Sequence, residues 1–457
     1  MLKNVIAIFD IGKSNKKILL FDTNYRVVFE EDQRFEEITD DDGFACDNID
    51  RIEKWMTATL SSIISLGEYK LAAVNFATYG ATLMYLDDNL KRLTPAYNYL
   101  KPMPDNVLEG FYERYGGIQE FSRITASPAM GMLNSGLQAL WLKRTKSDVY
   151  KHVKHVVHFP QYLSSFYTGE VVSEYTSIGC HTALWNFDDQ VYHQWVVDEE
   201  INLPTPSQNS LVIKVPFEGV PLPFGIGIHD SSASLVPYLM SSKEKFILIS
   251  TGTWCVFMNP FNDEPLTNDQ LISDTLCYLS ADQKQVKSSR LFLGHIHEVN
   301  AQRLSTHFKV AENSYKSVKI SEALLQSFTE KNQGNPVFFK EGVPKDYVDQ
   351  DVDLSQFSSY DEAYHQLMID LVNLSCEAIQ LIQTESDDTA SLYISGGFAK
   401  NEIYVRLIAS RFPDKKVYTS EISNSTALGA ALVVGKSVFE GKLPEIDLGL
   451  SEIKGCL

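Results

Sequence analysis

The pattern of apolar and polar positions at the start of the chain predicts two short strands around a polar turn. Apolar runs at 5–9 and 18–21 flank the polar stretch 10–17, a pattern typical of two strands joined by a tight turn. A third strand is predicted over 26–36, and the apolar spacing over 49–66 predicts a helix. Because strands and helices alternate, the pattern indicates the α/β class.

A further buried-type strand leads into a second polar segment. The apolar run over 71–76 predicts this strand, which ends at Thr78, Tyr79 and Gly80. In α/β sheets ligands gather at the carboxyl ends of the strands. Asp10 also stands where a strand ends, so we expect it to share one binding edge with these three residues.

The second half of the chain repeats the opening pattern. Apolar runs at 246–250 and 254–257 flank the glycine turn 251–253, and a later strand over 391–395 ends at Gly396. The other elements expected here are a long helix with a capping box at 359–362, a helix over 401–411, a strand over 416–418 and a last helix from 424–425. The repetition indicates an internal duplication.

A duplicated chain is expected to form two similar lobes. A length of 457 residues exceeds what one hydrophobic core usually supports. A boundary near 241–245 gives an N-terminal lobe of residues 1–242 and a C-terminal lobe of residues 243–457. Two such lobes would place their glycine turns face to face across a cleft, where phosphates would meet backbone amides from both sides.

The region from 100 to 225 is less regular. An amphipathic helix is predicted over 133–144, and the Pro- and Gly-rich segment 217–227 is predicted to be a loop. His152, His155 and His158 are spaced by three, which raises the question of a metal site. Their surroundings are typical of a strand, which sends alternate side chains to opposite faces, so structural histidines are favoured.

Composition and charge narrow the class of protein. The formal net charge of −19 argues against nucleic acid or an anionic membrane as a partner, and no apolar run approaches the length of a membrane span. The N-terminus lacks a signal-peptide pattern. The six cysteines are scattered without a C-x-x-C pair, as expected of reduced residues in a cytoplasmic protein. The acidic loop 40–43 is expected to be simply solvated.

The first turn carries the chemistry that a phosphate ligand needs. Gly12 allows a backbone conformation that other residues resist, and successive turn amides form an anion-binding nest. Lys13, Lys16 and Lys17 add positive charge, and Asp10 is suited to hold a divalent cation through its water shell. Taken alone, the stretch is equally well explained as a hairpin with a polar tip. Its recurrence in the second half favours the phosphate interpretation.

These motifs resemble those of the FGGY carbohydrate kinases. The stretch 10–17 resembles the first phosphate motif of that family, 250–254 the second, and 395–401 the adenosine motif, followed by the helix at 427–431. The family also has similar sequence motifs at the positions of Leu140-Trp141-Leu142 and 167–170. The resemblance covers most of the chain. It implies two duplicated lobes of the ribonuclease-H-like fold, shared with actin, around a central cleft.

The resemblance also implies roles for individual residues. His229-Asp230, before a Ser-rich helix start, matches the position of the catalytic aspartate, which accepts the proton of the sugar hydroxyl. The alternative is that Asp230 only caps that helix. The other implied residues are Asp10 for Mg²⁺; Gly12, Lys13, Ser14, Asn15, Lys17, Thr251, Gly252 and Thr253 for the ATP phosphates; Gly396, Gly397, Phe398, Asn401 and Gln302 for adenosine; and Thr78, Tyr79, Gly80, His229, Asp230 and Ser231 for the sugar. For Gln302 a solvated helix position is the favoured alternative.

Within the family the chain looks most like the rhamnulose kinases. This likeness rests on 229–234, on the Ser-Thr-Gly-Thr-Trp form at 250–254 and on 173–176. The chain departs from the family pattern at two ligand-binding positions. Lys13 stands where the first phosphate turn usually has Thr or another small residue. The segment 294–297 offers Gly or His in place of a sugar-binding Asn. The segment 78–82 differs from the form in xylulose kinases.

The function that these features predict is ATP-dependent phosphorylation of a small ketose such as L-rhamnulose, with Mg²⁺ as the metal. The alternatives are an ATPase of the actin or Hsp70 type that drives partner binding, suggested by the shared fold, and a sugar sensor without turnover, suggested by Lys13. The sequence leaves the sugar, the hydroxyl that is phosphorylated and the assembly, monomer or homodimer, open.

Overall fold

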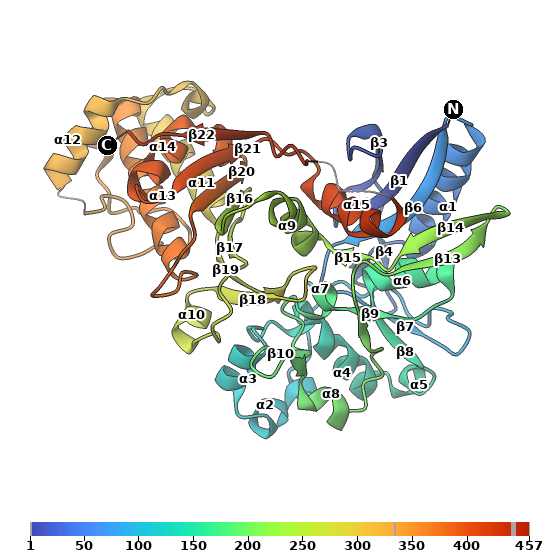
Figure 1. Cartoon of the computed structure of the whole chain (residues 1–457). Helices are drawn as coiled ribbons and strands as arrows, with labels where there is room; N and C mark the ends of the chain where they lie inside the picture. The colour runs from blue at the N-terminus through green and yellow to red at the C-terminus, as the bar shows by residue number, and fades with distance from the viewer. Residues whose placement is uncertain (1, 333–334, 440–444, 457) are drawn as a thin grey trace.

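Two mixed sheets organise the chain (Figure 1), described here from a computed structural model that covers residues 2–332, 335–439 and 445–456. The first sheet has the order β13-β14-β6-β1-β2-β3, with β15 beside β6, and the second has the order β18-β19-β17-β16-β20-β21-β22. The strands of the first sheet are β1 (Lys3–Ile11), β2 (Lys16–Phe21), β3 (Val27–Gln33), β6 (Tyr69–Thr78), β13 (Val212–Phe217), β14 (Val220–Gly225) and β15 (Ile228–His229). Those of the second are β16 (Phe246–Thr251), β17 (Cys255–Asn259), β18 (Thr275–Leu279), β19 (Gln285–Leu291), β20 (Ser391–Gly396), β21 (Lys416–Ser420) and β22 (Leu450–Ile453).

The two sheets have the same central arrangement, which confirms the predicted duplication. β1 is antiparallel to β2 and parallel to β6, and β16 is antiparallel to β17 and parallel to β20. In each sheet the hairpin that follows the first strand is closed by a short glycine turn. The duplicated α/β architecture follows from this repetition.

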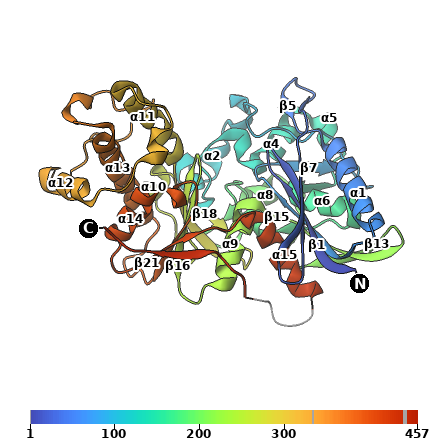
Figure 2. The same ribbon diagram turned by 90° about the horizontal axis from the view of Figure 1, so that it is seen from above.

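Helices cover both faces of each sheet. On the first sheet, α1 (Ile49–Ser65) and α6 (Phe159–Thr168) cover one face, and α9 (Asp230–Ser241) and α15 (Ser425–Val438) cover the other. On the second sheet, α11 (Leu293–Phe308), α13 (Tyr360–Gln380) and α14 (Glu402–Arg411) pack on one face, and α9 lies on the other. The helix α9 therefore lies between the two sheets, beside α15 (Figure 2).

The region between β6 and β13 forms a separate body below the first sheet (Figure 1). Its core also includes Leu266, Cys277 and Leu279 from the C-terminal half of the chain. The smaller elements are β4 (Ile38–Thr39), β5 (Ala45–Cys46), β7 (Leu83–Leu86), α2 (Phe111–Arg114), α3 (Ile118–Ile124), α4 (Ser135–Thr145), α5 (Ser147–Tyr150), β8 (His155–His158), β9 (Ser173–Glu174), α7 (Tyr175–Ile178), β10 (Trp185–Asn186), β11 (Val191–Tyr192), α8 (Gln194–Asp198), β12 (Pro206–Ser207), α10 (Asn268–Ile272) and α12 (Glu322–Asn332). None of the helices in the described residues is both long and apolar enough to span a membrane.

Two predictions of local structure are wrong. The segment 217–227 is largely the β13–β14 hairpin and not a loop. Pro221 and Pro223 are two positions apart, so the missing N–H groups lie on one edge of β14 and leave the other edge free to pair with β13. The helix α4 is not amphipathic, because residues 135–142 are all buried inside the region between β6 and β13.

Candidate active site

The carboxyl ends of three neighbouring parallel strands form one edge of the first sheet. Thr78 of β6 pairs with Ile11 of β1 on one side and with His229 of β15 on the other. This edge therefore brings together Asp10, the segment after Thr78, and Asp230. The sequence predicted that Asp10 and the segment after Thr78 would share one edge. The hydroxyl of Thr78 donates to the carbonyl of Tyr79 at 2.9 Å, and the Tyr79 hydroxyl donates to Asp47 at 2.6 Å.

The first glycine turn is tight, and its geometry corrects one expectation. The Gly12 N–H donates to the Asn15 carbonyl at 2.9 Å. Gly12 does not have the left-handed conformation that we expected, because its φ is not among the positive values. What favours glycine here is space: a Cβ would lie 3.1 Å from the carbonyl oxygen of Asn15. Ser14, at the tip of the turn, is exposed.

The lysines of this turn already have acidic partners. Lys13 Nζ lies 2.9 Å from Asp47 and 3.0 Å from Glu37. The buried Lys16 ammonium lies 2.8 Å from Asp47. Burial would raise the pKa of Asp47, but the hydrogen bonds from Lys16 and Tyr79 hold it below its usual range. Lys13 would therefore have to leave two carboxylates to reach a phosphate.

Lys17 lies closer to the predicted metal residue. Its ammonium lies 2.9 Å from Glu30 and donates to the side chain of Asn424 at 3.3 Å. Asn424 precedes α15, so this contact joins the first hairpin to a segment near the C-terminus. Lys17 stands opposite Asp10 in the β1–β2 register, and its charge favours the ionised form of that carboxyl group.

Asp10 and Asp230 influence each other electrostatically across the sheet edge. Burial raises the pKa of Asp10 to about 7, and the negative charge of Asp230 acts in the same direction, while Lys17 opposes it. A buried carboxylate with a second carboxylate nearby is stabilised by a cation. The oxygen chemistry of Asp10 therefore fits Mg²⁺, held directly or through water.

The carboxylate of Asp230 is held through one of its two oxygens. Oδ1 accepts from the Ser231 N–H at 2.6 Å and from the Ser231 hydroxyl at 3.2 Å, and lies 3.2 Å from Nε2 of His229. Within the described part of the chain, Oδ2 accepts no hydrogen bond, and the side chain is 34% exposed. The cap residue of α9 is His229, so the structure does not use Asp230 as the N-cap.

A buried network that sequence reasoning missed fixes His229. The His229 N–H donates to the Thr176 hydroxyl at 3.0 Å, and that hydroxyl in turn donates to Glu174 at 2.7 Å. Glu174 is completely buried and also accepts from the Asn209 side chain at 2.6 Å. Gly80 leaves room for the imidazole, because a Cβ on Gly80 would lie 2.8 Å from Nε2.

The second glycine turn is tied to the glycine pair after β20. The Thr251 carbonyl accepts from the Gly397 N–H at 3.0 Å, and the Thr251 hydroxyl accepts from the Phe398 N–H at 3.0 Å. Gly396 has φ +86°, and a Cβ there would lie 1.9 Å from the Thr251 carbonyl oxygen. Gly294 packs directly against the second turn, because a Cβ on it would lie 2.2 Å from the carbonyl oxygen of Gly252.

Two adjoining cavities lie beside this second turn. Both are bordered by Gly252, His297 and Tyr315, and their volumes are about 490 and 440 Å³. The larger is also lined by Gly397, Phe398 and Asn401, and the smaller by Thr253 and Gln302. The structure thus brings most of the predicted adenosine residues together. His297 belongs to the segment 294–297, which the sequence compared with a sugar-binding position, but the structure places it at these cavities. Tyr315 carries no motif signal, and sequence reasoning missed it.

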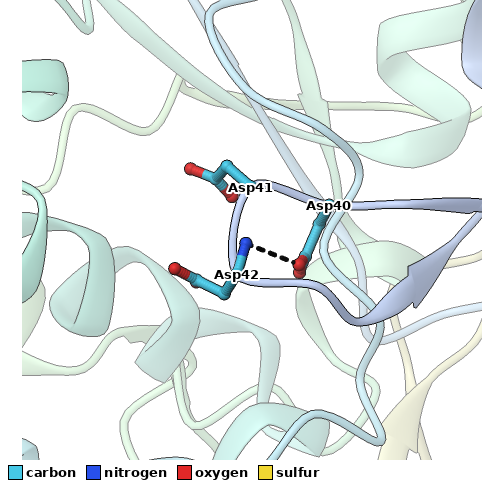
Figure 3. Close-up of side chains that lie close together, drawn as sticks. All are labelled: Asp40, Asp41 and Asp42. Atoms are coloured by element: carbon cyan, nitrogen blue, oxygen red, sulfur yellow. Dashed lines mark hydrogen bonds between the residues drawn. The ribbon is translucent and has the colours of Figure 1, made fainter.

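The acidic loop carries the three carboxylates of Asp40, Asp41 and Asp42 (Figure 3), which lie close enough together to suggest a cation site. Two lysines already neutralise them. Lys101, which is buried, lies 2.7 Å from Asp40, and Lys146 lies 2.7 Å from Asp41 and 2.8 Å from Asp42. The loop, which connects β4 and β5, is therefore an ion-pair cluster with Lys101 and with Lys146 just after α4, and is not simply solvated as expected.

Comparisons with known proteins were made for the sequence and the fold. Residues 5–204 match the model of the FGGY family of carbohydrate kinases, N-terminal domain, and residues 243–441 match the carbohydrate kinase FGGY, C-terminal domain. The chain is 23% identical to a rhamnulokinase of Oceanobacillus iheyensis, over 93% of this chain and 91% of that protein. It is 26% identical to a rhamnulokinase of Halalkalibacterium halodurans, where the match spans only 54% of either chain. A carbohydrate kinase structure from Novosphingobium aromaticivorans, 20% identical, superposes with a TM-score of 0.80 over 100% of this chain and 95% of that one.

Proposed function

The chain belongs to the FGGY family of carbohydrate kinases, and from this we propose that it transfers the γ-phosphoryl group of ATP to a hydroxyl of a small ketose of the L-rhamnulose type. The rhamnulokinase relatives and the stretches 173–176 and 229–234 support this choice of sugar. We divide the chain accordingly. Residues 1–242 contribute the sugar site and the first phosphate turn, and residues 243–457 the second phosphate turn and the adenosine site.

The observation that carries the proposal is the hydrogen bonding of the two oxygens of the Asp230 carboxylate. Two hydrogen bonds from Ser231 hold Oδ1, Nε2 of His229 lies 3.2 Å from it, and within the described residues Oδ2 accepts no hydrogen bond. A general base needs a fixed orientation and a free oxygen within reach of the acceptor hydroxyl. Asp230 meets both conditions, so we assign it as the group that accepts the proton of the sugar hydroxyl.

The remaining residues bind and orient the reactants. In the turns at Gly12–Asn15 and Thr251–Thr253, the amides other than those of Gly12 and Gly252, which already donate within their turns, would hold the ATP phosphates, with Lys17 as a nearby cation. The cavities beside Gly397 and Gln302 would hold adenosine. Asp10 would hold Mg²⁺, which neutralises phosphate charge when bound. Thr78, Tyr79 and Gly80 shape the sugar side, and closure of the lobes would exclude water.

The proposal is tested by ADP release from ATP and Mg²⁺ with a panel of ketoses, L-rhamnulose included. We expect ADP release that depends on a ketose, with L-rhamnulose among the best acceptors. ADP release that is independent of sugar would instead indicate an ATPase of the actin type. Sugar and ATP binding without ADP release would indicate a sensor. Either result would overturn the proposed activity.

A further inference from the structure

His297 of α11 stands where the two cavities beside the second glycine turn meet. It borders both of them, together with Gly252 and Tyr315. The residue is only 8% exposed. Its ring is edge-on to Phe398, with the ring centroids 5.4 Å apart, and edge-on to Tyr315 at 5.0 Å. The imidazole is thus held in one place at the border of the proposed adenosine site.

The two cavities differ in the side chains that line them. Val318 and Phe398 give the larger cavity apolar walls, and the charged residues that also line it are exposed. The smaller cavity is lined by the polar side chains of Glu298, Gln302 and Asn313. A flat heterocycle packs on apolar walls and is oriented by a few polar groups, whereas sugar hydroxyls need several polar partners. This difference favours the base of a nucleotide in the larger cavity and its ribose in the smaller.

The side-chain amide of Asn401, which the family resemblance assigned to adenosine, already has partners. Oδ1 accepts from the Tyr404 N–H at 3.1 Å as the N-cap of α14, which fixes which end of the amide is the oxygen. Nδ2 donates to the Tyr364 hydroxyl at 3.0 Å and lies 4.0 Å from Sδ of Met368. The N–H groups of this amide thus face partners inside the protein.

The hydroxyl of Tyr364 lies between a donor and an acceptor. Tyr364 is completely buried, and its hydroxyl oxygen lies 2.9 Å from Nε2 of His297. Among the described residues, its other hydrogen-bond partner is the NH₂ group of Asn401, which can only donate. A buried hydroxyl proton needs an acceptor, so the Tyr364 hydroxyl donates to Nε2 of His297. Nε2 therefore carries no proton.

The neutral imidazole of His297 then carries its one proton on Nδ1. Burial lowers the pKa of His297 to about 4, so the ring is not doubly protonated near neutral pH. Within the described residues Nδ1 makes no hydrogen bond, yet it is not among the buried atoms that lack a partner. Since the residue is otherwise buried and borders both cavities, the Nδ1–H group is accessible from them.

We propose that Nδ1–H of His297 donates a hydrogen bond to a ring nitrogen of the ATP base, and that Tyr364 and Asn401 are positioning residues that keep the proton on Nδ1. This inference rests on the proposed kinase function, because it takes the two cavities as the adenosine site. The ring nitrogens N1, N3 and N7 of adenine accept hydrogen bonds. A base without an acceptor at this point would leave the N–H group unpaired, so the contact selects the base.

The first test measures the binding of ATP and of its 1-deaza, 3-deaza and 7-deaza analogues to the full chain by calorimetry with Mg²⁺. Each analogue replaces one ring nitrogen by a C–H group and keeps the phosphates. We expect the wild type to bind one of the three at least about tenfold more weakly than ATP. His297→Ala should bind ATP about tenfold more weakly than the wild type does, and should no longer distinguish that analogue from ATP.

Two binding results would overturn the inference. One is that the wild type binds all three analogues as tightly as ATP. The other is that His297→Ala still discriminates against the same analogue, which would mean that another group makes the contact.

The second test determines the tautomer directly, by nitrogen-15 NMR of the full chain labelled at its ten histidines. The signals that vanish in His297→Ala belong to His297. We expect them to show a protonated Nδ1 and an unprotonated Nε2. The reverse tautomer, or a doubly protonated ring at pH 7, would overturn the role assigned to the imidazole. This measurement needs no nucleotide.

The positioning role of Tyr364 is tested by Tyr364→Phe. Without the hydroxyl nothing keeps the proton on Nδ1, so discrimination against the sensitive analogue should fall to less than about threefold. If Tyr364 were merely structural, ATP and all three analogues would weaken by the same factor, and that result would overturn the positioning role. If the variant does not fold, the nitrogen-15 spectrum of the wild type still decides the tautomer. The control is Tyr238→Phe, which also removes a buried hydroxyl, here one that donates to Ser420 at 2.9 Å, and should discriminate like the wild type.

The outcomes separate this inference from the kinase assignment. Ketose-dependent ADP release together with equal binding of ATP and the three analogues would remove the role of His297 alone. Discrimination among the analogues without ketose-dependent ADP release would keep that role and remove the proposed activity. Failure of the wild type to bind ATP would overturn both.

Discussion

The carboxylate of Asp230 raises the pKa of Asp10, although the two residues lie 220 positions apart in the sequence and at the ends of different elements. Asp10 lies near the end of β1, and Asp230 begins α9 directly after β15. The parallel pairing of β1 and β15 with β6 brings them to one edge. Two carboxylates at such an edge repel each other, and the pKa of Asp10, which burial raises most, is expected to fall when Asp230 is neutralised.

Asp10→Asn should change how stability depends on pH. The folded-state pKa of Asp10 is about 7, above its unfolded value of 3.8, so the folded protein binds this proton more tightly. Its contribution to stability is present below about pH 4 and is lost as the pH rises to about 7, by up to about 4 kcal/mol. When the free energy of unfolding is measured with urea in EDTA, it should therefore fall less between pH 5 and pH 8 in Asp10→Asn than in the wild type. The exposed-site variant Asp88→Asn is the control and should follow the wild type.

Asp230→Asn should lower kcat by about 10²–10⁴-fold, because an amide cannot accept the hydroxyl proton. The ATP dissociation constant should change by less than about threefold, since the adenosine cavities lie in the other lobe. Coupled ADP assays and calorimetric ATP titration measure the two quantities. Ser231→Ala removes the hydroxyl donor to Oδ1 but keeps the donor from the Ser231 N–H, and should cost less than about tenfold. Full turnover in Asp230→Asn would remove the assigned base.

Gly80→Ala should weaken use of the sugar and spare the nucleotide. The new methyl would lie 2.8 Å from Nε2 of His229, so the imidazole must move away from Asp230. We expect kcat/KM for the best ketose to fall at least about tenfold and KM for ATP to stay within about twofold. Circular dichroism and the melting temperature show whether the variant folds. Equal losses for sugar and ATP would contradict the placement of Gly80 at the sugar side.

Gly396→Ala and Gly397→Ala form a matched pair at neighbouring positions. Alanine at 396 would have to adopt φ near +86° with its Cβ 1.9 Å from the Thr251 carbonyl oxygen, so it should cost at least about 2 kcal/mol and disturb the second turn. A Cβ on Gly397 meets no atom within 4 Å, so that variant should fold like the wild type. Its methyl lines the larger cavity and should raise KM for ATP moderately. Thermal unfolding and ATP kinetics of both variants provide the check.

Local signals account for what the sequence could predict. The hairpins at Asp10–Lys17 and 250–254 were predictable because strand, glycine turn and strand are adjacent in the chain, and their repetition indicated two lobes. The conformation of Gly12 was predicted wrongly, because the composition of a turn does not distinguish a positive φ from a lack of space. Asp47 was missed as a site residue because its partners Lys16 and Tyr79 come from other elements that only the fold brings together. Glu174 stood in the named stretch 173–176 but received no role, because the pattern does not show that its carboxylate is buried and bonded to Thr176, Ser177 and Asn209.

Two other features, the burial of α4 and the residues that border the cavities, were also not predictable from the local pattern. The residues of α4 include Ser135, Gln138 and other polar groups, so the pattern favoured one solvated face, but the surrounding region buries residues 135–142 and leaves only the end of the helix in contact with solvent. Tyr315 borders the cavities without belonging to any recognisable motif, and His297 borders them although its segment was compared with a sugar-binding position. Their position depends on how α11 and the segment after it fold back on the second turn.

The packing of α15 bears on how the chain matures on the ribosome. Residues 427–434 cover the first sheet beside Ile6 and Ile8, and the carbonyl of Ala430 accepts a hydrogen bond from Asn75 in β6 at 2.9 Å. The part of this face that α15 covers, beside α9, thus stays exposed until residues 425–438 have left the exit tunnel. The N-terminal lobe cannot complete its core before α15 is available, and a nascent chain stalled before residue 425 should expose an apolar surface that chaperones recognise.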